Sequence, residues 1–212
     1  MSDVFTGALW ARDLRHATRP ELDGRYAITE VGRAEAMAGH LARAMGTSEA
    51  AILERVAGGG AWVAWSWRDE EVVAWCWVST RETYATPLRR TLQLGAGDCF
   101  AWGAETLEAH RGRGLFTAIL EHIAWHLARE GWDTLWGGIG DDKIASQRAN
   151  ARAGFRPVLR VTAEHEPPPT QIWSVPADYA DARLVERARE MLGPSASLLA
   201  GETPAELTGA MA

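Results

Sequence analysis

Two arginines and two glycines stand directly before a helix in the run EAHRGRGLFTAIL, residues 108–120. The preceding run CFAWGAETL is typical of a strand, and residues 115–129 repeat apolar side chains with the period of an amphipathic helix. A strand that passes through glycines into a helix leaves several backbone N–H groups at the helix start without partners. The junction therefore predicts a fold in which a sheet strand feeds a helix directly and an anion binds where they meet.

The residue types at this junction suit a phosphate. Gly112 and Gly114 let a phosphate approach the backbone closely, and Arg111 and Arg113 add charge-assisted donors, so a pyrophosphate is the natural occupant. A tight turn whose arginines face water is the alternative reading of the same residues. The run lacks the GxxxxGK[ST] pattern of a Walker loop, and it lacks the third glycine and downstream acid of a dinucleotide-binding fingerprint.

Composition excludes several classes of function. The chain has 212 residues, 47% of them hydrophobic, which is enough for a packed core. A net charge of −6 disfavours nucleic acid as a partner. The first residues lack the apolar stretch of a signal peptide and no later run suits a membrane span, which predicts a cytoplasmic protein. Cys76 and Cys99 show no zinc-ligand spacing and are expected to be buried thiols.

The chain reads as alternating strands and helices. We expect strands at 25–31, 61–67, 72–78, 99–107, 130–140 and 155–165, and an edge strand at 172–175. We expect helices at 31–45, 47–60, 115–129, 144–154 and 182–192, the second with Thr47 as N-cap. Residues 80–98 are predicted as a loop, residues 1–24 as an N-terminal extension, and the tail from Gly193 as mobile.

Five of the eleven tryptophans lie in the hairpin formed by 61–67 and 72–78. Alternation along each strand predicts one face with Val63, Trp65 and Trp67, and a matching face with Val73, Trp75 and Trp77. Packing in the core is the ordinary role of such side chains. The alternative is that Trp65 and Trp75 line an acceptor pocket and receive a cation or a ring.

Together, the run at residues 108–120 and a second run at residues 143–155 resemble the signatures of the GNAT superfamily of N-acetyltransferases. Arg111 to Phe116 is similar to the family signature [QR]xxGx[GA] that cradles the pyrophosphate of coenzyme A, except that Phe116 replaces a small residue. The run KIASQRANARAGF, residues 143–155, is similar to a second signature, with Lys143 where Asn is usual and Ser146, Gly154 and Phe155 in place. Two motifs in the right order are more specific than either alone, and the resemblance covers residues 25–166.

The resemblance implies an α+β fold. Its central sheet is mixed and mostly antiparallel, with splayed fourth and fifth strands flanked by helices. The acyltransferase domain is expected at 25–176, between the extension at 1–24 and a C-terminal helix and tail at 177–212. The pantetheine arm of the coenzyme is expected to pair with residues 101–105, and Gly137 and Gly138 leave room for the thioester.

The resemblance also implies an activity, the transfer of an acetyl or other acyl group from acyl-CoA to the amine of a small molecule. Glu105 is the expected base, although a solvated carboxylate is its ordinary alternative, and a backbone N–H between Ala104 and Thr106 would bind the oxyanion. Asn150 stands where many family members have a tyrosine acid, so the thiolate is expected to leave with help from hydrogen bonding or water. The expected cofactor-binding residues are Ala104, Thr106, Arg111, Gly112, Arg113, Gly114, Leu115, Phe116, Lys143 and Ser146.

No metal site is expected, because His122 and His126 lack a third ligand and suit an ordinary helix flank. Two alternatives keep the fold but change the function. The first is a donor carried by a carrier protein or an aminoacyl-tRNA, met by Arg148, Arg152, Arg156 and Arg160, for which solvated helix charge is the ordinary alternative. The second is an acyl-CoA-binding module without catalysis. A homodimer also stays open.

Overall fold

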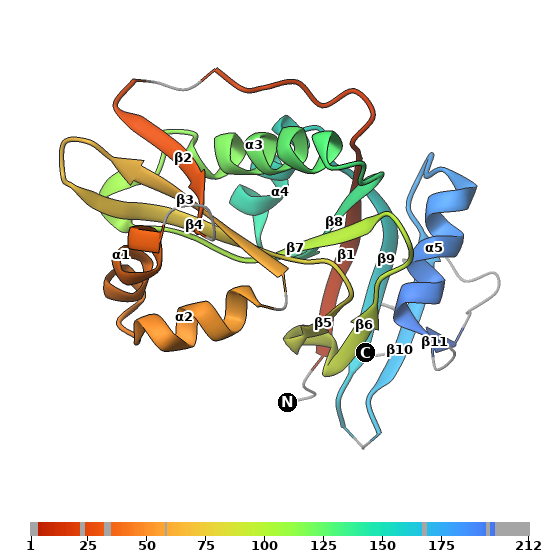
Figure 1. Cartoon of the computed structure of the whole chain (residues 1–212). Coiled ribbons are helices and arrows are strands. Elements are labelled where there is room, and N and C mark those ends of the chain that lie inside the picture. The colour runs from red at the N-terminus through yellow and green to blue at the C-terminus, as the bar shows by residue number, and fades with distance from the viewer. Residues whose placement is uncertain are drawn as a thin grey trace.

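The computed structural model describes residues 4–21, 24–31, 35–57, 59–166, 169–193 and 196–197. Among these residues, nine strands form one sheet in the order β11-β10-β9-β1-β8-β7-β4-β3-β2, and β5 pairs with β6 in a separate hairpin (Figure 1). Within the large sheet, β7–β8 and β10–β11 are the parallel pairs. The predicted mixed, mostly antiparallel sheet is therefore confirmed.

The bounds of the elements are as follows. The strands are β1 (Val4–Asp13), β2 (Tyr26–Glu30), β3 (Gly59–Ser66), β4 (Glu71–Ser79), β5 (Glu82–Ala85), β6 (Arg90–Gln93), β7 (Asp98–Thr106), β8 (Thr134–Gly140), β9 (Arg156–Glu164), β10 (Gln171–Pro176) and β11 (Ala196–Ser197). The helices are α1 (Glu35–Met45), α2 (Glu49–Val56), α3 (Leu115–Arg129), α4 (Ile144–Arg152) and α5 (Ala182–Leu192).

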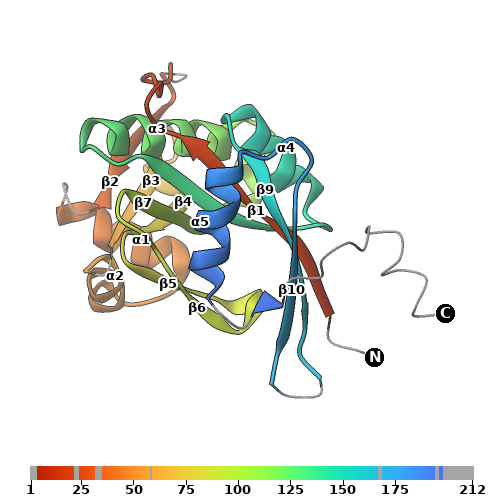
Figure 2. The same cartoon turned by 90° about the vertical axis from the view of Figure 1, so that its right-hand side faces the viewer.

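Helices cover both faces of the sheet. Helices α3 and α4 lie on one face, and α1 and α2 lie on the other (Figure 1). The stripe of α3 that contains Ile119, Leu120 and Ile123 is buried in a core cluster with residues of β3 and β4. Helix α5 packs against β9 and β6 on the face opposite α3, and Figure 2 shows it lengthwise. The helices predicted at 115–129 and 182–192 have these bounds in the structure.

Strand β1 lies in the middle of the sheet, between β8 and β9. Gly7 lies opposite Gly140 of β8 on one side and opposite Val161 of β9 on the other. The prediction of an extension at 1–24 is therefore wrong for Val4–Asp13. The partners of β1 lie more than 120 residues away in the sequence, so no local pattern predicts the pairing. The pairing satisfies backbone N–H and C=O groups that β8 and β9 would otherwise expose. The tail predicted as mobile from Gly193 is corrected at Ala196–Ser197, which form β11 and pair with β10, while residues 198–212 lie outside the described residues.

The tryptophan hairpin of β3 and β4 forms as predicted, but a bulge changes its faces. Val63 and Trp65 share a cluster with Trp75 and Trp77 beneath α1, as expected. Val73 faces the α3 side instead, because the register shifts so that Trp65 lies opposite Val72. Trp67 lies beyond the end of β3 and is 62% exposed.

Two local predictions are corrected by the structure. The segment predicted as a loop at 80–98 contains the β5–β6 hairpin, which buries Thr83 and Leu92 although its strands have four residues each. The N-cap of α2 is Ser48 instead of Thr47, and the Ser48 hydroxyl accepts a hydrogen bond from the Ala51 N–H at 3.2 Å.

A buried carboxylate anchors α5 to the first residues of β7 and β8. Arg187 donates through Nε to Asp98 Oδ2 at 3.3 Å and through Nη1 to Thr134 Oγ1 at 3.2 Å. It also forms an ion pair with Asp98 Oδ1, which accepts from Trp136 Nε1 at 2.8 Å. Asp98 is only 2% exposed, and the guanidinium and the indole offset the free-energy cost of burying its carboxylate.

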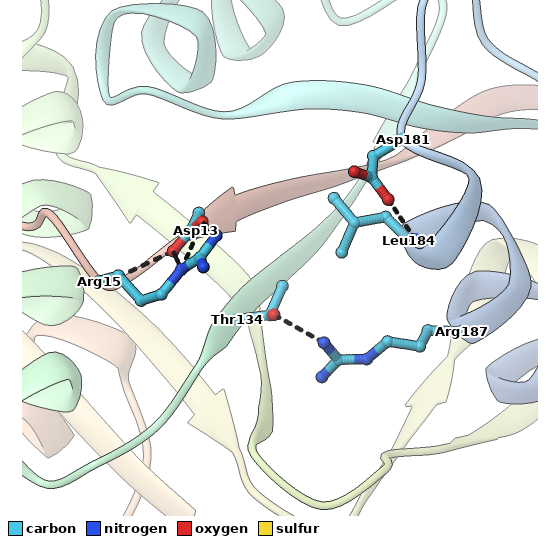
Figure 3. A network of polar contacts seen from close by, with 6 residues as sticks. All are labelled: Asp13, Arg15, Thr134, Asp181, Leu184 and Arg187. Atoms are coloured by element: carbon cyan, nitrogen blue, oxygen red, sulfur yellow. Dashed lines mark hydrogen bonds and ion pairs between the residues drawn. The ribbon is translucent and has the colours of Figure 1, made fainter.

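Near this anchor, local side-chain contacts lie at the start of α5 and at the end of β1 (Figure 3). Asp181 caps α5 by accepting hydrogen bonds from the backbone N–H groups of Arg183 at 2.8 Å and Leu184 at 3.4 Å. At the end of β1, Asp13 accepts from the backbone N–H of Arg15 at 2.9 Å, and the side-chain hydrogen bond from Arg15 lowers the pKa of Asp13 to about 2. Both contacts start or end an element where the chain changes direction.

Removing the Arg187 cation should destabilise the protein strongly. The substitution Arg187→Met leaves Asp98 buried without its ion-pair partner, which typically costs about 3–5 kcal/mol in the free energy of unfolding. Urea denaturation measures this loss. The double variant Asp98→Asn/Arg187→Met should recover part of the stability because no unpaired charge remains, and an equal loss in both variants would contradict the explanation.

Candidate functional site

Strands β7 and β8 part after a short parallel pairing. Their register runs from Asp98 opposite Thr134 to Ala101 opposite Gly137 and ends there, although β7 continues to Thr106. On its other edge β7 pairs with β4, where a bulge sets two residues of β7, Gly103 and Ala104, against one of β4. The bulge increases the bend of β7 away from β8, so the edge beyond Ala101 is open. The predicted splay is confirmed.

Gly103 is required at this bulge for two reasons. Its φ of +57° lies in the left-handed region, which side chains disfavour. A Cβ added there would also stand 2.9 Å from Cδ1 of Trp77. Trp77 in turn stacks on Trp102, with ring centroids 5.7 Å apart, so the ring pair and the glycine fix the course of β7 together.

A cleft of about 1030 Å³ occupies the opening between the two strands and continues along α3 and α4. The sequence predicted twelve catalytic and cofactor-binding residues, and the structure brings eleven of them together on its walls. These eleven are Ala104, Glu105, Thr106, Arg111, Gly112, Gly114, Leu115, Phe116, Lys143, Ser146 and Asn150.

The end of the cleft at the start of α3 has a backbone geometry that suits an anion. Gly112 and Gly114 have φ values of +74° and +76°, and Gly114 is the N-cap of α3 without a side-chain cap. The first intrahelical hydrogen bond runs from the Ala118 N–H to the Gly114 carbonyl at 3.0 Å. The N–H groups before Ala118 are therefore left for a ligand, at the positive end of the helix dipole. Arg111 lines the same end, held by a hydrogen bond from its Nε to the Thr106 carbonyl at 3.0 Å.

Arg113 is the predicted residue that does not line the cleft. Its Nη1 donates to the Tyr26 hydroxyl at 2.8 Å, and its Nη2 donates to the Ala109 carbonyl at 3.0 Å. Tyr26 also contacts Nδ1 of buried His110 at 3.4 Å, and Nε2 of that ring lies 3.6 Å from Asp69. Arg113 thus braces the glycine loop from outside, where sequence reasoning expected a phosphate contact.

Helix α4 supplies a second positively charged wall. Lys143, Arg148 and Arg152 line the cleft with Arg111, whereas its carboxylates are Glu105 and Asp142. Lys143 lies 2.7 Å from Asp142, and its hydrogen bond lowers the pKa of that carboxyl. The sequence offered Arg148 and Arg152 as helix-surface charge or as contacts for a carrier or RNA; the structure turns both toward the cleft, which is suited to an anionic ligand.

The two predicted catalytic side chains lie on different walls. Glu105 is exposed on β7, opposite Trp75 of β4, and so is directed to the α1 and α2 face of the sheet. Asn150 is 5% exposed on α4, and its Nδ2 donates to the Ser146 carbonyl at 2.9 Å. The Glu105 carboxylate therefore lies near the open edge of β7, and the Asn150 amide lies on the α4 wall of the cleft.

Neither Trp65 nor Trp75 lines the cleft. Trp75 is 4% exposed in the core under α1, and the ring of Trp65 meets His40 edge to face at 4.6 Å. The tryptophan on the cleft wall is Trp102, whose Nε1 donates to Ser79 Oγ at 2.9 Å. Sequence reasoning missed it, although its position on the splayed strand itself was the signal that could have singled it out.

Comparison with known proteins defines the fold. No protein-family model matches the sequence, and no curated protein matches it. A solved GCN5-related N-acetyltransferase from Sphaerobacter thermophilus superposes with a TM-score of 0.55 and 17% identity, over 77% of this chain and 53% of that one. A tandem GNAT protein from the clavulanic acid biosynthesis pathway superposes with a TM-score of 0.53 and 19% identity, over 79% and 55%.

At these identities the likeness shows the fold, and this chain has the fold of the GCN5-related N-acetyltransferases. The resemblance in the two sequence motifs is thereby confirmed for the fold. The chain matches little more than half of the length of those solved structures. Within the described residues, none of the helices is long and apolar enough to cross a membrane.

Both cysteines should be unreactive in the folded protein. Burial raises the pKa of Cys76 and of Cys99 to about 12, with Asp98 and Glu130 adding to the shift of Cys99. Because the thiolate is the reactive form, an aromatic disulfide reagent at pH 8 should titrate neither thiol within minutes. In denaturant the reagent should titrate both, and rapid reaction of the native protein would contradict the prediction.

Proposed function

We propose that this protein transfers an acyl group from acyl-CoA to a primary amine of a small molecule. The observation that carries the proposal is one cleft that joins an anion-binding helix start to the open edge of a splayed strand. A diphosphate suits the first feature and an extended amide-containing arm suits the second, because the arm can pair with β7 as an added strand does. Coenzyme A combines both groups in one molecule.

The charge of the cleft supports a whole coenzyme A as the donor. Coenzyme A carries a diphosphate and a separate phosphate monoester, the latter alone about −1.5 to −2 at pH 7. Arg111, Lys143, Arg148 and Arg152 line the cleft as counter-charges. A carrier-bound arm has a single phosphodiester and would neutralise fewer of these cations. The carrier protein is therefore the weaker of the two donor candidates.

The arrangement of residues supports a direct attack of the amine on the thioester. Glu105 would accept the proton that the amine loses as it attacks, from the open end of β7. Backbone N–H groups between Ala104 and Thr106 would stabilise the oxyanion. The acceptor would be a small molecule that enters beside Trp102. We draw no role for a metal ion, because the acyl transfer as written needs none.

Binding of acetyl-CoA to variants of the glycine loop tests the donor site. Arg111→Gln should raise the dissociation constant about 10-fold, the typical effect of losing one charge-assisted hydrogen bond. Arg113→Gln is the matched control and should change it less than about 3-fold, because Arg113 contacts Tyr26 and Ala109 outside the cleft. Isothermal titration calorimetry measures both.

The outcomes separate the candidate functions. No binding of acetyl-CoA to the wild-type protein would refute the donor. Binding with release of free thiol in the presence of an amine panel would support the acyltransferase. Tight binding without thiol release would favour the non-catalytic acyl-CoA-binding module, and turnover with a phosphopantetheinyl carrier alone would favour the carrier donor.

The substitution Glu105→Gln tests the proposed base. A positioned general base typically contributes about 100-fold or more, so kcat should fall by about that factor while acetyl-CoA still binds. Glu108→Gln is the matched control, since Glu108 lies three residues along in the short turn before the glycine loop and does not line the cleft. A thiol-release assay in which both variants lose activity equally would argue against Glu105 as the base.

A further inference from the structure

Ser146 and Asn150 lie one turn apart on α4, and both line the cleft. Nδ2 of Asn150 donates to the Ser146 carbonyl at 2.9 Å and contacts Ser146 Oγ at 3.4 Å. An amide oxygen would repel the carbonyl, so this contact fixes which way the Asn150 amide faces. Its Oδ1 points toward Gly137 of β8, 4.0 Å from where a Cβ of that glycine would stand.

The amide therefore presents an acceptor to the opening between β7 and β8 and cannot donate to a departing sulfur there. The Ser146 hydroxyl can. A serine hydroxyl has one hydrogen to donate and two lone pairs to accept with. Among the described residues, Asn150 Nδ2 is the one hydrogen-bond partner of Ser146 Oγ, and it uses a lone pair. The hydroxyl hydrogen is left for a group in the cleft.

The Thr117 hydroxyl on the cleft wall is placed differently. Its Oγ1 is directed to the Ala149 carbonyl at 3.5 Å, and no tyrosine of the described residues lines the cleft. Helical side chains lean toward the N-terminus of their helix, so the end of the side chain at position 150 lies over the turn that carries Ser146. The two side chains therefore act at one place on the wall, with the hydroxyl as the donor.

Resting on the proposed acyl transfer, we propose that Ser146 donates a hydrogen bond to the sulfur as it leaves and that Asn150 is its positioning residue. When the C–S bond of the tetrahedral intermediate breaks, its electron pair goes to sulfur and the carbonyl reforms. The proton lost by the amine goes to Glu105, and the hydroxyl hydrogen stays on Ser146. Coenzyme A leaves as a thiolate stabilised by this bond and takes its proton from solvent.

Single-turnover release of thiol from acetyl-CoA with a saturating amine tests the role of Ser146. Ser146→Ala should lower this rate about 10- to 150-fold, the range for a hydrogen bond to a charged group. The dissociation constant of acetyl-CoA should change less than about 2-fold. Ser146→Thr keeps the hydroxyl and should keep the rate. Ser174→Ala, a serine of β10 away from the cleft, is the matched control.

Variants of Asn150 test the positioning. Asn150→Ala should lower the rate by a similar factor, and the double variant Ser146→Ala/Asn150→Ala should be no slower than either single variant, because both act through one bond. The double variant Ser146→Ala/Asn150→Tyr should recover part of the rate that Ser146→Ala loses, because the introduced side chain carries a hydroxyl that reaches the same turn of α4. If the Asn150 variants fail to fold, the Ser146→Ala and Ser146→Thr pair still decides.

The result that overturns the inference is an unchanged rate in Ser146→Ala, a loss confined to binding, or an equal loss in Ser146→Thr. These outcomes are distinct from failure of the proposed function. A wild-type protein that binds acetyl-CoA and releases no thiol with any amine refutes the acyl transfer, and this inference with it. Turnover by the wild type with an unaffected Ser146→Ala overturns the inference alone.

Discussion

The parting of β7 from β8 is the constraint on which the rest of the site depends. Two parallel strands that stay paired leave no edge for a ligand, and these two stop pairing at Ala101 and Gly137. The bulge at Gly103 bends β7, and it exists because glycine accepts a positive φ and leaves room for the Trp77 ring. Without it, β7 would continue beside β8 and close the cleft.

At the opposite end of the same strand pair, β7 and β8 stay paired. Asp98 and Thr134 form the first pair of the parallel register, and Arg187 of α5 donates to both. A helix near the C-terminus thus clamps the strands where they must stay together, while the bulge separates them where they must part. The clamp lies in a buried, low-dielectric position, which makes it strong when complete and costly when one partner is lost.

The two signature runs were readable from sequence because their chemistry is local. Arg111, Gly112 and Gly114 act through backbone conformation and a helix start, which adjacent residues determine, and the structure places all three on the cleft. Arg113 has the same residue type and an adjacent position, but the hydroxyl of Tyr26 and the carbonyl of Ala109 hold it outside the cleft. Alternation alone does not tell whether a tryptophan faces the core or the cleft, so it does not distinguish Trp65 and Trp75, which pack in the cluster beneath α1, from Trp102, which lines the cleft.

The sequence by itself determined the hairpin of β3 and β4, the bounds of α3 and α5, and the strand-to-helix junction, since periodicity and glycine positions encode these over short distances. Tertiary structure alone decided that Val4–Asp13 runs through the middle of the sheet and that Arg148 and Arg152 line the cleft. It also decided that the Ser146 hydroxyl contacts the Asn150 amide. These features depend on which distant elements become neighbours, and the energy that selects them comes from pairing and burial across the whole chain.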